Sequence, residues 1–93
     1  MNEDLRSKLE DEVSKANAMS AAYNQVLGSF FENKQAQLFQ AFAAVKSGDV
    51  DGLVGIHNAS KALMSLELEI QGVIDSGKLA AAQIKEDEEG TAL

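Results

Sequence analysis

The feature that most constrains the fold is an apolar heptad repeat that runs unbroken from residue 53 to residue 76. Ile56, Leu63 and Ile70 stand seven residues apart along this segment. The residues three positions after each of them are also apolar: Ala59, Leu66 and Val73. Alternating steps of three and four residues place these side chains in one stripe, which coiled-coil helices bury against each other. The repeat therefore predicts a second helical segment that covers it.

A long first helix over about residues 3–46 is the expected partner of this stripe. Asn2 stands where it can cap the helix, and acidic residues follow in the first turn, where they complement the positive end of the helix dipole. The segment contains no proline and one glycine, Gly28. One helix of roughly 60 Å is therefore allowed at ~1.5 Å per residue.

The heptad pattern of the first helix slips in its middle. Leu27 and Leu38 are separated by an eleven-residue step, which is a stutter that locally unwinds a coiled coil. We interpret the helix as continuous through this point. The alternative is a kink or a break at the neighbouring Gly28.

A short turn after Lys46 is expected to connect two antiparallel helices. A cation in the last helical turn and a glycine, Gly48, that can adopt the left-handed C′ conformation both favour a helix end there. Asp49 or Asp51 then caps the second helix. The spacing of these acids resembles a calcium loop, but Asn58 stands where the bidentate glutamate is needed, so we interpret them as turn and cap residues.

The second helix is expected over about residues 50–76. Gly77 can end it, in which case a short third helix over about residues 78–86 follows. If the helix instead continues through Gly77, the hairpin register places Ala81 near Ala16. The predicted fold is thus all-α, an antiparallel helical hairpin.

The formal charge of −7 lies mainly at the two ends of the chain. Residues 1–12 hold five acids and two bases and residues 85–93 hold four acids and one base, which gives −3 at each end and leaves −1 for the body. We predict a single helical-hairpin domain over residues 1–84 and an acidic disordered tail over residues 85–93. Nucleic acid is not an expected partner, because its binding requires clustered Lys and Arg. The alternative role for the tail is a short acidic recognition peptide.

The chain holds more apolar surface than one hairpin buries. Leu5 and Leu9 extend beyond the predicted hairpin, and the phenylalanines of residues 30–45 cover too wide an arc for one partner helix. We therefore predict a coiled-coil homo-oligomer, with a groove for another protein and a membrane-surface helix as alternatives. The polar face lacks the Lys and Arg typical of the membrane alternative. The predicted interface residues are Leu5, Leu9, Val13, Phe31, Leu38, Phe39 and Phe42.

No residue pattern predicts catalysis. His57 is the only histidine, and its helical neighbours are Leu53, Ser60 and Lys61, so we interpret it as a surface or boundary residue. The chain has no cysteine, no Glu-x-x-His pair and no glycine-rich phosphate loop. We expect no enzyme activity, no cofactor and no metal site. No apolar run approaches ~20 residues and no signal sequence opens the chain, so we expect a cytoplasmic protein without a membrane partner.

A set of residues in the middle of the chain carries a family resemblance. These residues are Gly48, Asp49, Leu53, Ile56, His57, Lys61, Ala62, Leu63, Leu66, Glu67, Ile70 and the run Ile74-Asp75-Ser76-Gly77-Lys78-Leu79-Ala80. The pattern resembles small, uncharacterised helical proteins of tailed bacteriophages, some of which lie among virion-assembly genes. The resemblance implies a phage setting, in the bacterial host cell or the virion, and assigns no site residues.

From these observations we expect a non-enzymatic helical assembly or adaptor protein that acts through self-association and protein–protein contacts. The alternative function is that of a small acidic inhibitor or regulator that binds a host protein and presents carboxylates in place of nucleic acid.

Overall fold

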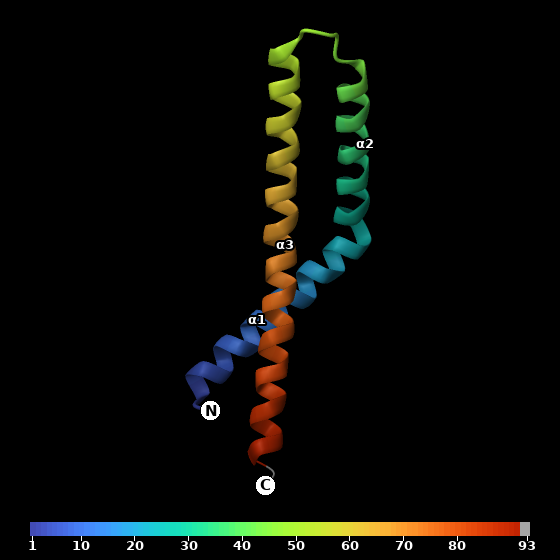
Figure 1. The fold of residues 1–93 in the computed structure, drawn as a ribbon. Helices are drawn as coiled ribbons and strands as arrows, with labels where there is room; N and C mark the ends of the chain where they lie inside the picture. Colours follow the sequence, from blue (N-terminus) through green and yellow to red (C-terminus); the bar gives the residue numbers. More distant parts are fainter. Residues whose placement is uncertain (92–93) are drawn as a thin grey trace.

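The computed structural model describes residues 1–91, which are helical apart from the first two residues and the turn at residues 45–49. The elements in order are α1 (Glu3–Ala22), the π-helical segment η1 (Tyr23–Leu27), α2 (Gly28–Ala44) and α3 (Val50–Thr91). The molecule is elongated, with extents of 68 × 23 × 19 Å. Figure 1 shows α2 antiparallel to the first half of α3, whereas α1 crosses the second half. The all-α prediction is confirmed.

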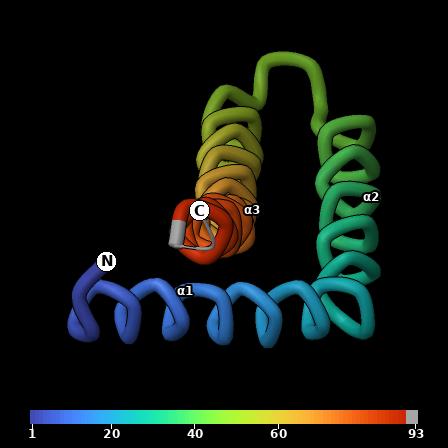
Figure 2. The backbone as a smooth tube through the Cα atoms, turned by 90° about the horizontal axis from the view of Figure 1, so that it is seen from below, coloured from blue at the N-terminus to red at the C-terminus, as the bar shows by residue number. Residues whose placement is uncertain are grey.

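The first helix is kinked. Its backbone stays in the right-handed helical region from α1 through η1 into α2, yet the chain changes direction sharply between α1 and α2 (Figure 2). The N–H of Gly28 donates to the carbonyl oxygen of Tyr23, which is the five-residue bond of a π-bulge. A π-bulge is an established cause of helix kinks. The eleven-residue step in the sequence thus marks a kink, which was the alternative to the expected uninterrupted helix.

The turn between α2 and α3 follows local chemistry. Helix α2 ends at Ala44 and not at Lys46, because the next residue is already extended. Gly48 takes the positive φ of 90° that the turn requires, and the N–H of Asp49 donates to the carbonyl oxygen of Lys46 at 3.1 Å. The Asp49 carboxylate then accepts from the N–H of Gly52 at 3.0 Å and caps α3. The predicted Asp49 cap and the positive φ of Gly48 are therefore confirmed, but Gly48 is the third residue of the turn 46–49 and not the C′ residue of α2, whose C-cap is Val45.

Helix α3 runs straight through Gly77, so the predicted helix end at this position is wrong. Gly77 is buried where α1 crosses α3, and a Cβ atom added to it would overlap the Cβ of Ala16. The same atom would lie 3.2 Å from the carbonyl oxygen of Glu12. The glycine therefore serves close packing between two helices and not a helix end.

The third helix expected over residues 78–86 is the continuation of α3, which extends to Thr91. Residues 85–91, expected as part of a disordered tail, are likewise helical; the last two residues of that predicted tail, 92 and 93, lie outside the described part of the chain. Salt bridges join this end of α3 to α1. The terminal amine of Met1 lies 3.0 Å from Asp87 Oδ1, and Arg6 Nη2 lies 2.5 Å from Glu88 Oε1. Hydrogen bonds to Glu88 and Glu10 raise the pKa of Arg6.

The core is small and lies mainly where α1 and α2 meet α3. Among the described residues the buried apolar side chains are Leu9, Ala16, Phe31, Ile70 and Ala80. Helix α3 packs more extensively against α1 than against α2. Along α2 the apolar stripe of α3 is only partly covered, since Ile56 and Leu63 are half-buried but Leu66 on the same stripe is 47% exposed.

Replacing Gly77 with Ala is expected to lower the free energy of unfolding by about 1–3 kcal/mol, because the new methyl group forces α1 away from α3. Gly72→Ala is the matched control in the same helix. No atom lies within 4 Å of a Cβ at that position, so the better helix propensity of Ala should stabilise the protein by up to about 1 kcal/mol. Urea unfolding followed by circular dichroism measures both; equal stabilisation by the two substitutions would contradict the packing role of Gly77.

Candidate functional site

Two of the seven predicted interface residues are buried inside the chain. Phe31 is 2% exposed and Leu9 is 6% exposed. Leu9 was expected to lack an apolar partner in its own chain, and this expectation is wrong because α3 extends to Thr91 and accompanies α1. The shorter second helix assumed from the sequence is the source of the error. Both side chains belong to the core of the single chain.

The remaining predicted residues are accessible to different degrees. Phe39 is 72% exposed, Phe42 57% and Leu5 46%. Val13 and Leu38 are half-buried. The structure therefore leaves Phe39 and Phe42, near the end of α2, as the predicted side chains most open to a partner.

The exposed apolar side chains gather in one half of the molecule. We call this half the arm and define it as residues 28–68, which comprise α2, the turn and the first part of α3; the stem is the rest of the chain. The exposed large apolar residues of the arm are Phe30, Phe39, Phe42, Val50, Leu53, Val54, Met64, Leu66 and Leu68. In the described part of the stem they are Met1, Leu5, Val26 and Leu79. Two helices alone cannot cover each other on all sides, so the arm keeps apolar surface that a third layer would bury.

An aromatic cluster holds the base of the arm. The rings of Tyr23 and Phe31 stack with centroids 6.3 Å apart, and Phe30 meets Phe31 edge to face at 5.7 Å. The ammonium group of Lys34 lies 5.7 Å from the centroid of the Phe30 ring. These contacts explain the burial of Phe31 and anchor α2 beside the kink.

A polar cluster bridges the helices next to these rings. The hydroxyl of Tyr23 donates to Glu67 Oε1 at 3.3 Å, and Gln35 Nε2 donates to Glu67 Oε2 at 3.4 Å. Burial raises the pKa of Tyr23, and the charge of Glu67 raises it further. Sequence reasoning missed this cluster. The sequence feature that could have indicated it is the position of Glu67 four residues after Leu63, which places this glutamate on the covered side of α3.

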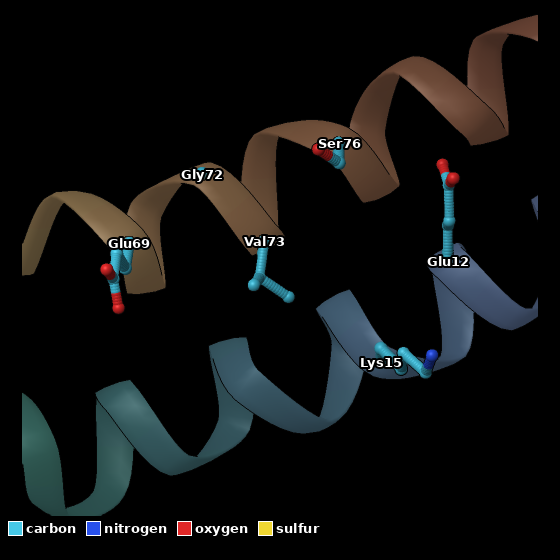
Figure 3. A pocket seen from close by; sticks show the side chains of 6 residues that line it. All are labelled: Glu12, Lys15, Glu69, Gly72, Val73 and Ser76. Atoms are coloured by element: carbon cyan, nitrogen blue, oxygen red, sulfur yellow. The ribbon is translucent and has the colours of Figure 1, made fainter. Parts of the chain in front are cut away.

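An open groove lies between α1 and α3 where the two helices diverge. It has a volume of about 540 Å³ and is lined by Glu12, Lys15, Glu69, Gly72, Val73 and Ser76. Figure 3 shows Val73 pointing from α3 toward α1 and Glu12 pointing from α1 toward α3. A second hollow of about 400 Å³ shares Lys15 and Val73 with it. Ligand pockets of this size usually enclose their ligand and present convergent polar groups. This groove is open, so we interpret it as a consequence of the helix crossing.

The described residues were also compared with the requirements of a catalytic site, a metal site and a membrane span. His57 is exposed on α3. Within residues 1–91, no three His, Cys, Asp or Glu side chains are grouped so that they could hold a metal ion. In the same range no helix is long and apolar enough to cross a membrane. Comparison of the chain with protein-family models, curated proteins and solved structures found no match. The exposed apolar surface of the arm is therefore the candidate functional site.

The single tyrosine of the chain allows a direct test of the polar cluster. A raised pKa means that folded Tyr23 holds its proton more tightly than the unfolded chain, whose tyrosine pKa is about 10. The contribution of this pKa difference to the free energy of unfolding is complete below pH ~10. It is lost as the pH rises through the pKa of Tyr23 in the folded protein. Absorbance at 295 nm should give a pKa above that of the urea-unfolded protein. Glu67→Gln should lower it only in part, because burial is the larger cause; equal values in folded and unfolded protein would contradict the cluster.

Proposed function

We propose that this chain is a non-enzymatic helical assembly or adaptor protein that works through self-association and protein–protein contacts. The observation that supports this is the exposed apolar surface of the arm. A fully exposed phenylalanine side chain presents ~150–250 Å², so Phe39 and Phe42, which lie three residues apart on α2, together expose on the order of 200 Å². The other apolar residues of the arm add to this. Apolar patches beyond a few hundred Å² mark interaction sites on monomeric proteins.

The small core supports the same proposal. A chain of 93 residues buries a modest share of its surface, and few of its apolar side chains are fully buried. The chain has no cysteine and therefore no disulfide bond. Association with a partner would bury the apolar surface of the arm and stabilise the fold by mass action.

A role in phage virion assembly is a narrower form of the proposal, and it rests on the sequence resemblance alone. The alternative of a small acidic inhibitor is less well supported. Asp87 and Glu88 form salt bridges with the Met1 amine and Arg6 of the same chain, so they offer fewer charges to a basic partner.

Light scattering coupled to size exclusion tests the proposal on the full chain. We expect a mass above the monomer value of 9.9 kDa at high micromolar concentration, because the apolar arm surface then becomes covered. The mass should decrease on dilution. A strictly monomeric chain over the whole concentration range would refute self-association.

A further inference from the structure

We infer that the arm of one copy pairs with the arm of a second copy in antiparallel orientation, so that two arms form a four-helix bundle and the two stems point away from each other. This inference rests on the proposed function and adds to it the identity and orientation of the partner. It follows from the position of the apolar side chains and the distribution of charge.

One face of the arm carries an apolar strip formed by side chains of both helices, with His57 and Ser60 between its two residues on α3. The hydrogen bond between Gln35 and Glu67 joins α2 and α3 on this face. Phe39 lies four residues after Gln35 on α2, and Met64 lies three residues before Glu67 on α3. Because the two helices are antiparallel, both side chains lie about one helical turn closer to the tip of the arm than the hydrogen bond does. Leu53 lies eleven residues, or about three turns, before Met64 and shares its side of α3.

These side chains are open to solvent. Phe39 is 72% exposed, Met64 63%, Phe42 57% and Leu53 41%. The strip thus reaches from the Gln35–Glu67 bridge to the turn.

The strip faces away from α1. Gly77, which contacts α1, lies thirteen residues after Met64, and this spacing places the two about 140° apart around α3. Figure 2 shows that α1 lies on one side of the layer formed by α2 and α3. The opposite side of the layer is therefore free of the chain's own helices. A partner can approach it without displacing α1.

Charge indicates which partner fits and how it is oriented. The arm holds four acids and three bases, a net charge of −1, whereas the rest of the chain holds eleven acids and five bases, a net charge of −6. Two arms can therefore meet with little repulsion, but two stems cannot lie side by side without it. A parallel pair would align the stems. An antiparallel pair keeps them at opposite ends of the assembly.

A two-fold pair would place the four exposed apolar side chains of one arm against the same four of the other. These are Phe39, Phe42, Leu53 and Met64. A two-fold pair uses the same patch on both copies, so no second complementary surface is required. Four antiparallel helices with buried facing stripes form a well-known bundle.

The site of pairing is tested by matched substitutions of exposed residues. Phe39→Ser and Met64→Ser should each raise the dimer dissociation constant at least tenfold, as measured by sedimentation equilibrium. Leu79→Ser is the control, because Leu79 is 67% exposed but lies on the stem, and it should change the constant less than twofold. Circular dichroism verifies that all three variants remain folded.

The possible outcomes separate the inference from the proposed function. An oligomer that the two arm substitutions leave intact, or that Leu79→Ser weakens equally, would overturn arm pairing and leave self-association standing. A full chain that is monomeric at every concentration would overturn both.

The orientation is tested with a spin label on the turn. The chain has no cysteine, so Ser47→Cys supplies a single attachment site at the tip of the arm. Helix α2 has 17 residues and a length of about 26 Å, so antiparallel arms should hold the two labels ~25–40 Å apart in a pulsed dipolar measurement. Parallel arms would place the turns within ~20 Å of each other, at the spacing of adjacent helices, and would overturn the antiparallel arrangement.

Discussion

The contact between Ala16 and Gly77 is the constraint on which the rest of the structure depends. The absence of a side chain at Gly77 lets α1 cross closely over α3, and the π-bulge at Tyr23–Leu27 turns α1 into that crossing. Without the kink, α1 would continue along the axis of α2 and form a regular two-helix hairpin. The crossing instead leads α1 obliquely over the far half of α3.

This crossing divides one continuous helix, α3, between two different environments. In the stem, small residues such as Ala16 and Ala80 allow close packing that buries the apolar face within the chain. In the arm, only α2 packs against α3, and large side chains such as Phe39 and Met64 stay exposed. The stem also carries most of the negative charge. The chain therefore has one half whose apolar side chains are largely covered by its own helices and one half where several large apolar side chains stay exposed.

The sequence predicted a surplus of apolar surface but only part of its location. Phe39 and Phe42 lie on the exposed arm as expected, whereas Leu9 and Phe31 are core residues. Met64 and Leu53 were missed as exposed apolar residues, since the heptad stripe suggested that α3 had one buried side. The exposure of a side chain on α3 depends on which helix packs against that side of α3. The path of α1 determines where α1 covers α3 and where only α2 does. Periodicity describes a single helix and contains no information about the path of another.

The sequence by itself determined the features that depend on a few adjacent residues. The Asn2 cap, whose side chain accepts from the N–H of Leu5 at 2.7 Å, the left-handed Gly48 and the Asp49 cap are of this kind, because their bonds form within one turn of the chain. Only the tertiary structure decided the role of Gly77. A glycine can end a helix in the left-handed conformation or stay in the right-handed conformation and admit a neighbouring helix, and glycine itself permits both backbone conformations. The choice depends on whether another helix is close enough to fill the missing Cβ position, and here Ala16 fills it.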